Sequence, residues 1–146
     1  MKFTFVTLFS NLIEPYFHDS ILKRAIESNF ISYEFYNPRD FTTNKHKKVD
    51  EQMVGGGAGM LLTCQPLFDC LDEIKSKNAD AYIVFPLAAA KPFRQNDAKR
   101  LAKKKNIVFV SGRYEGIDER VIEKYANEVF SIGEFILTGG ELPSLV

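Results

Sequence analysis

The chain has no tryptophan, only two cysteines and two histidines, and no net charge, because 19 basic side chains balance 19 acidic ones. Cys64 and Cys70 lie six positions apart and form no CxxC pair, and His18 and His46 are distant from both. These absences argue against a cysteine-based zinc site, so we expect reduced thiols and no metal site. The balanced charge excludes proteins that bind nucleic acids through bulk basicity.

Long apolar runs are also missing. No stretch approaches the roughly 20 residues that a membrane-spanning helix needs, and the chain opens without the charged and then apolar pattern of a signal peptide. We therefore expect a cytoplasmic protein without membrane contact. With 146 residues, 45% of them hydrophobic, one domain covering residues 1–146 can bury a sizeable core.

Short apolar runs alternate with amphipathic segments along the chain. Strands are expected at Lys2–Phe9, Ile31–Tyr36, Ala81–Phe85, Ile107–Val110 and Val129–Ile132. Helices are expected from the cap Asp19 to Ser28, from Pro66 to Asn78, from a cap at Asn96 or Asp97 to Lys105, and over Asp118–Tyr125. This alternation predicts an α/β fold with a mostly parallel sheet and helices on both faces.

The segment from Arg39 to Met60 shows no sustained periodicity, and we expect a long irregular loop with a functional role. A second basic segment follows between Lys91 and Lys105. Such runs are usually solvated faces, and contact with nucleic-acid phosphates is the alternative. The residues that we expect to contact RNA are Arg39, Lys45, Lys47, Lys48, Gly55, Gly56, Gly57 and Gly59.

All nine glycines lie beyond residue 54, in three groups that follow expected strands or fall in the long loop. A single pair would be an ordinary turn, but three groups favour ligand-binding loops at the carboxyl ends of strands. The sequence contains neither GxGxxG nor a P-loop, which argues against an enzyme with a nicotinamide cofactor.

The acid–base candidates are carboxylates, because no Ser, His and Asp arrangement stands out. Glu115 and Asp118 lie close in sequence to Arg113 and Arg120. Surface ion pairs at a helix start and a functional role are equally compatible with this cluster. We expect Arg113 to keep Glu115 ionised and ion-paired, which suits positioning better than proton transfer.

Three segments together resemble a known family: GGGAGM at 55–60, SGRYEGIDER at 111–120 and SIGEFILTGGELP at 131–143. They are similar to the bacterial tRNA (guanine-N1)-methyltransferases, the TrmD family of the SPOUT class, and the resemblance covers essentially the whole chain. It implies a C-terminal deep trefoil knot, a homodimer, S-adenosylmethionine as methyl donor and transfer to N1 of guanine at position 37 of tRNA. It also implies assistance by Mg²⁺.

Carried over by residue, the resemblance assigns the methyl donor to the second and third segments, and it suggests Glu115 as a guanine contact. The expected donor-binding residues are Gly112, Tyr114, Glu115, Gly116, Ile132, Gly133, Glu134, Phe135, Ile136, Leu137, Gly139, Gly140 and Pro143. One departure is the run Phe85–Lys91, which has no glycine where the family has a Ser-, Pro- and Gly-rich loop.

The second departure lies at the C-terminal end. The family's chains continue past Pro143 and supply there the Arg and Asp that activate guanine N1. We therefore expect a truncated chain, with the catalytic residues and the tRNA-binding domain beyond Val146. This chain is expected to be inactive alone. The three residues after Pro143 are expected to be too few to form a helix. The alternative is a non-catalytic RNA-binding module that uses both basic segments and ignores S-adenosylmethionine.

Overall fold

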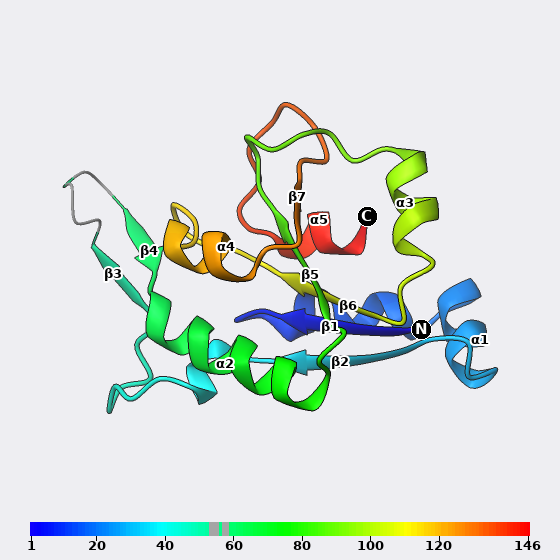
Figure 1. The fold of residues 1–146 in the computed structure, drawn as a ribbon, viewed down its shortest axis with the longest axis horizontal. Helices are drawn as coiled ribbons and strands as arrows, with labels where there is room; N and C mark the ends of the chain where they lie inside the picture. Colours follow the sequence, from blue (N-terminus) through cyan, green and yellow to red (C-terminus); the bar gives the residue numbers. More distant parts are fainter. Residues whose placement is uncertain (53–55, 57–58) are drawn as a thin grey trace.

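A five-stranded parallel sheet forms the centre of the fold in the computed structural model, which describes residues 1–52, 56 and 59–146 (Figure 1). The strands, in their order across the sheet, are β2 (Ser32–Tyr36), β1 (Lys2–Val6), β6 (Asn106–Val110), β5 (Tyr82–Pro86) and β7 (Glu128–Phe130). Phe5 on β1 stands opposite Phe35 on β2 and Phe109 on β6. All pairings in this sheet are parallel, so the expected α/β class and mostly parallel sheet are confirmed.

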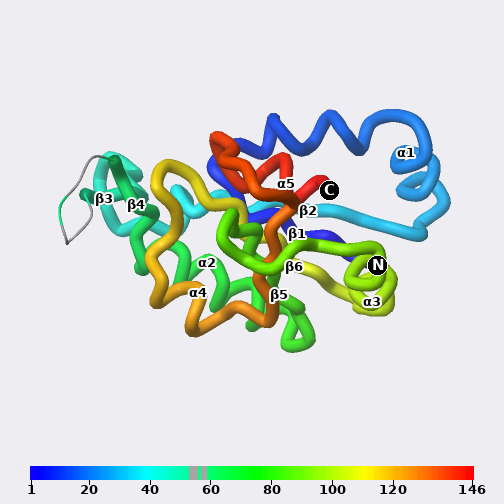
Figure 2. Tube along the Cα trace, turned by 90° about the horizontal axis from the view of Figure 1, so that it is seen from above, coloured from blue at the N-terminus to red at the C-terminus, as the bar shows by residue number. Residues whose placement is uncertain are grey.

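Helices cover both faces of the sheet, as expected. One face packs against α2 (Cys64–Lys77) and α4 (Glu119–Tyr125), and the other against α1 (Ser20–Glu27) and α3 (Gln95–Leu101). The alternation of side chains along a strand explains this division, because Val6 joins the core beneath α2 whereas its neighbour Phe5 joins the core beneath α1. Figure 2 shows α2 and α4 on one side of the sheet and α1 on the other.

A two-stranded antiparallel ribbon extends beyond the sheet (Figure 1). It consists of β3 (Asp50–Gln52) and β4 (Met60–Leu62), and the preceding segment contains the short 3-10 helix η3 (Pro38–Asp40). The expectation of an irregular Arg39–Met60 loop is therefore wrong at its end. Strands of three residues are too short to produce a recognisable period, and β4 is fixed by a long-range bridge from Leu62 to Ile117.

Several expected boundaries also need correction. The first strand ends at Val6 rather than Phe9, because the N–H of Phe9 turns back to the Thr7 hydroxyl, and two further 3-10 helices follow, η1 (Ser10–Leu12) and η2 (Glu14–Phe17). Helix α3 is shorter than expected at its C-terminal end. Its Asp97 accepts the N–H of Arg94 from the third helical position instead of capping the helix. The last strand ends at Phe130, whereas Asp19 caps α1 as expected.

The chain after Gly140 forms a short helix, α5 (Glu141–Leu145). The expectation that the residues around Pro143 are too few to form a helix is therefore wrong. Five residues would not hold a helix in isolation, and tertiary contacts stabilise this one. Glu141 and Ser144 are buried, and the Ser144 hydroxyl lies 3.0 Å from that of Ser111 at the end of β6. Among the described residues, no helix has the length and apolar character to cross a membrane.

Candidate functional site: a glycine-lined cavity at the ends of β5, β6 and β7

The loops that follow β5, β6 and β7 enclose a cavity of about 320 Å³. Open parallel sheets bind ligands at this edge, where the carboxyl ends of the strands meet. The wall is formed at the end of β5 by Pro86, Leu87 and Ala88, and after β6 by residues 112–117. At and after the end of β7 it is formed by Phe130, Ser131, Ile132, Gly133, Phe135, Ile136, Leu137, Gly139, Gly140 and Pro143.

The structure brings nearly all the expected donor-binding residues to this one wall. They are Gly112, Tyr114, Glu115, Gly116, Ile132, Gly133, Phe135, Ile136, Leu137, Gly139, Gly140 and Pro143. Glu134 is the exception and is not part of the wall. Sequence reasoning missed Leu87 and Ala88, although the glycine-free run Phe85–Lys91 indicated that side of the site. Ligand binding by these residues stays a prediction.

The loops contact one another backbone to backbone. The N–H of Gly140 donates to the C=O of Gly112 over 2.9 Å, and a Cβ atom on Gly140 would lie 2.7 Å from the Cα of Ser111. Glycine at 140 therefore permits an approach that any side chain would block. On the other side of the cavity, the N–H of Ser131 donates to Lys91 and the C=O of Ser131 accepts from Phe93, which interlocks the loops after β5 and β7.

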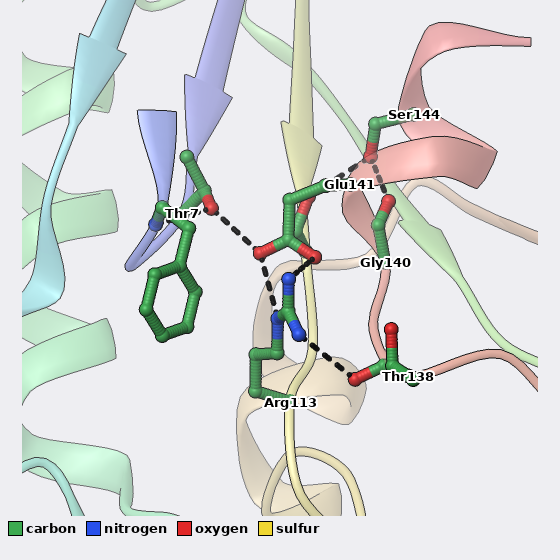
Figure 3. Close-up of polar contacts among 8 residues, drawn as sticks. Thr7, Arg113, Thr138, Gly140, Glu141 and Ser144 are labelled. Carbon is green, nitrogen blue, oxygen red and sulfur yellow. Dashed lines mark hydrogen bonds and ion pairs between the residues drawn. The ribbon is translucent and has the colours of Figure 1, made fainter. Parts of the chain in front are cut away.

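Arg113 forms an ion pair with Glu141, and the expected pairing with Glu115 is wrong. Its Nη2 lies 2.9 Å from Oε2 of Glu141, and its Nε donates to Oε1 over 3.0 Å (Figure 3). Tyr114, at φ +59°, turns the chain between positions 113 and 115, and the N–H of Gly116 closes this turn on the C=O of Arg113. The side chain of Glu115 is exposed at the cavity.

The β3–β4 ribbon is joined to the same cavity loop. The N–H of Glu115 donates to the C=O of Met60, and the N–H of Leu62 donates to Gly116. Gly59 thereby lies beneath the Glu115 side chain. Two of the motifs recognised in the sequence thus meet in space. Of the expected RNA-contacting glycines, Gly56 is exposed, whereas Gly55 and Gly57 lie outside the described residues.

The two basic segments lie at opposite ends of the molecule. The segment with Arg39 and Lys45, Lys47 and Lys48 leads into the ribbon and contributes nothing to the cavity wall, whereas α3 lies at the far end (Figure 1). The three lysines are exposed; Lys47 pairs with Asp40 over 3.4 Å, and Arg39 donates to the backbone C=O of Lys47. Near α3, acidic partners neutralise part of the charge, because Glu128 pairs with both Lys91 and Arg100.

Other ionisable groups around the site are already engaged. Asp118 caps α4 and accepts from Arg120, and this guanidinium holds the pKa of Asp118 well below its usual range. Burial raises the pKa of the Cys64 thiol, and Asp118 raises it further. Within the described part of the chain, no group of three or more His, Cys, Asp or Glu side chains could hold a metal ion.

One protein family matches the chain along its whole length. The family model described as "tRNA (Guanine-1)-methyltransferase TrmD" matches residues 1–146. Two proteins named tRNA (guanine-N(1)-)-methyltransferase, from Sulfurimonas denitrificans and a Sulfurovum species, are 66% and 68% identical to the chain over 146 residues. The chain is fully covered in both alignments and spans 63% and 64% of these relatives.

A solved structure is similar over the same range. The crystal structure of tRNA (m1G37) methyltransferase from Aquifex aeolicus matches 99% of this chain and 65% of its own, with a TM-score of 0.89 and 30% sequence identity. A family model that covers all 146 residues, together with relatives of this identity, leaves one conclusion. The chain belongs to the tRNA (guanine-1)-methyltransferase family TrmD.

Proposed function

We propose that the cavity binds S-adenosylmethionine and that the chain is the donor-binding part of an enzyme that methylates N1 of guanine at position 37 of tRNA. The observation that carries the proposal is the meeting of three loops, each following a parallel strand, around one cavity of about 320 Å³. Small-molecule sites start at about this size and combine apolar walls with a few polar groups. The names of the relatives support the reaction.

The residues present fit this donor. Apolar side chains such as Leu87 and Ile132 suit the faces of an adenine ring, and close backbone segments around Gly112 and Gly140 offer N–H and C=O groups to its edge. The exposed carboxylate of Glu115 suits a cationic group or the N–H edge of guanine. When bound, S-adenosylmethionine supplies an electrophilic methyl group.

The carboxylates on this chain are better suited to holding than to proton transfer. Methylation of guanine N1 requires removal of its proton, and a positioned base contributes typically about 10² to 10⁴-fold. Asp118 and Glu141 are each paired with an arginine, so Glu115 is left to hold the guanine edge. We propose that the base, and the arginine that stabilises charge on O6, come from the portion of the relatives outside the matched 146 residues, together with their tRNA-binding domain.

The assistance by Mg²⁺ that the resemblance implies stays a prediction, and the described residues include no group of three or more His, Cys, Asp or Glu side chains that could hold a metal ion. A trefoil knot is part of the proposal and has topological support. Strand β7 lies beyond β5 at the sheet edge, yet α5 contacts Thr7 and Ser111, which follow β1 and β6 on the other side of β5. The segment between them therefore passes the carboxyl end of β5, and it exchanges hydrogen bonds with the loop after β5 at Ser131, as a knotted path requires.

We also propose that the protein is a homodimer. We propose a cytoplasmic location because the proposed substrate is tRNA. Exposed apolar side chains on the segment between β1 and α1 support a dimer surface, because Phe9, Leu12 and Tyr16 are 38%, 53% and 61% exposed. Sedimentation velocity of the purified chain tests the assembly.

The function is tested by calorimetric titration with S-adenosylmethionine and by single-turnover transfer of labelled methyl to tRNA with guanine at position 37. We expect this chain to bind the donor and to transfer methyl several orders of magnitude more slowly than a chain of the relatives' length. A tRNA with adenine at position 37 serves as the control. Salt-sensitive tRNA binding without donor binding would instead favour the RNA-binding module, and full turnover by this chain would move catalysis to Glu115 or Asp118.

A further inference from the structure

A nearly buried ion pair joins the cavity wall to the C-terminal segment, because Arg113 is part of the wall and Glu141 lies beneath it. In the pair Arg113–Glu141 the side chains are 16% and 4% exposed, which makes it the most buried ion pair among the described residues. Burying two charges costs desolvation energy that their attraction often fails to recover, so such a pair contributes little net stability. Its value lies in fixing one arrangement of the segments that carry it.

Three of the five N–H groups of the Arg113 guanidinium are turned towards the protein itself. Its Nε and Nη2 face the two carboxylate oxygens of Glu141, and its Nη1 donates to the C=O of Thr138 over 3.1 Å (Figure 3). Thr7 completes the network by donating to Oε1 of Glu141 over 2.8 Å. The network therefore connects the ends of β1 and β6 to the C-terminal segment.

One glycine of the wall, Gly139, rests directly on this network. A Cβ atom on Gly139 would lie 2.5 Å from Nε of Arg113 and 2.6 Å from Oε2 of Glu141. Gly139 also bridges Arg113 through the backbone, and Gly140 donates to Gly112. The position of the segment from Thr138 to Gly140 is thus set by the ion pair beneath it.

We infer that Arg113 and Glu141 are positioning residues for the donor site, which hold the Thr138–Gly140 segment against Gly112 in its binding conformation. The inference rests on the proposed function. If one charge is removed, the remaining buried charge has no partner and must reach water, which displaces the segment that covers it. Donor affinity then falls because the wall is no longer preformed.

The test compares Glu141→Gln, which keeps the shape and the Thr7 contact but removes the charge, with Arg113→Lys, which keeps the charge but loses the two-pronged geometry. Both are titrated with S-adenosylmethionine well below their melting temperatures. We expect the Kd to rise ~10-fold or more for Glu141→Gln and less for Arg113→Lys, because a preformed wall lowers the cost of binding. Arg100→Lys, which weakens the 2.7 Å pair with Glu128 away from the cavity, is the matched control and should stay near the wild-type affinity.

Hydrogen exchange separates positioning from general stability. Positioning predicts faster exchange confined to residues 132–141, whereas a purely structural role predicts faster exchange throughout the sheet with unchanged donor affinity of the folded protein. A folded Glu141→Gln chain with wild-type affinity would overturn the inference. If Glu141→Gln and Arg113→Lys both fail to fold, Gly139→Ala is the substitute variant, because its methyl group presses against the same ion pair. If all three variants fail to fold, the ion pair is required for the fold, and the inference is overturned. If the wild-type chain binds no donor, the proposed function itself fails.

Discussion

Glu115 lies directly over Gly59, so the cavity loop and the β3–β4 ribbon share one contact. A Cβ atom on Gly59 would lie 2.7 Å from Oε1 of Glu115, and the backbone of Glu115 donates to Met60 next to it. Gly59 also has φ +107°, a conformation that side chains disfavour. The position of the exposed Glu115 side chain therefore depends on the absence of a side chain at Gly59, a residue from a distant part of the sequence.

Replacing Gly59 by alanine should displace the Glu115 side chain and strain the ribbon. Unrelieved strain of this kind costs about 1–3 kcal/mol, but the ribbon lies outside the main sheet and can rearrange locally, so we expect the melting temperature to fall by less than that cost implies. We expect shifted amide resonances for residues 114–117 in NMR spectra and weaker donor binding. Gly56→Ala is the matched control, because its φ is also positive at +79° but a Cβ atom there meets nothing. Equal effects of the two substitutions would show that strain, not the contact with Glu115, is responsible.

Alternating apolar runs were sufficient to predict the five strands of the main sheet and the four helices that pack on it, and Asp19 and Asp118 were correctly placed at helix starts. Those signals are local. The pairing of β1 with β6, which brings Val6 beside Val110, joins segments about a hundred residues apart and leaves no periodic trace.

In the candidate site, too, local features could be predicted from the sequence and long-range contacts could not. The grouping of the glycines predicted ligand-binding loops at the ends of strands, and the two groups that follow β6 and β7 line one cavity, whereas the described glycines of the group at 55–59 do not contribute to its wall. The partner of Arg113 could not be predicted, because Glu115 is close in the sequence whereas Glu141 is brought near only by the path of the C-terminal segment. The same contacts explain why α5 forms although its few residues predict no stable helix.

The lysines before the ribbon should determine the salt dependence of tRNA binding. Lys45 and Lys48 are exposed, and Lys47 has only an exposed pairing with Asp40, so all three are accessible to phosphates. Each phosphate contact contributes roughly 0.7–0.9 to the slope of log K against log salt concentration. Replacing the three lysines by alanine should lower that slope by about 2. The matched control replaces Lys99, Lys103 and Lys105 near α3. An unchanged slope in the first variant would show that Lys45, Lys47 and Lys48 are solvated and do not contact phosphates.

The two thiols should react slowly in the folded protein. Cys70 has no exposed surface, and burial raises the pKa of its thiol to about 12, so the reactive thiolate is scarce at pH 8. Cys64 is half-buried and its pKa is also raised, so it should react first. The rate of reaction with Ellman's reagent, in buffer and in denaturant, measures this order. In Cys64→Ser the remaining thiol should report unfolding alone, and a rapid reaction of native Cys64→Ser would contradict the buried position of Cys70.

Asp118 should stabilise the fold at neutral pH and lose this effect in acid. Its pKa is lowered from 3.8 by the hydrogen bond from Arg120, so the folded state keeps the carboxylate charged at pH values where the unfolded chain already binds a proton. The contribution is complete above pH 4 to 5 and disappears as the pH falls towards the folded-state pKa. Because Arg120 is 72% exposed, solvent screening limits the charge effect to about 0.5–1 kcal/mol.

Two variants separate the charge from the helix cap. Asp118→Asn keeps an oxygen that can accept the N–H of Arg120, so the free energy of its unfolding should fall by the charge effect alone. Asp118→Ala loses the cap as well and should cost about 1 kcal/mol more. Urea unfolding at pH 7 and pH 3 measures both, and the difference between wild type and Asp118→Asn should shrink at pH 3. In an Arg120→Ala background this difference should be small at either pH, since the lowered pKa depends on that guanidinium. A difference that stays constant between pH 7 and pH 3 would mean that Asp118 acts only through its cap.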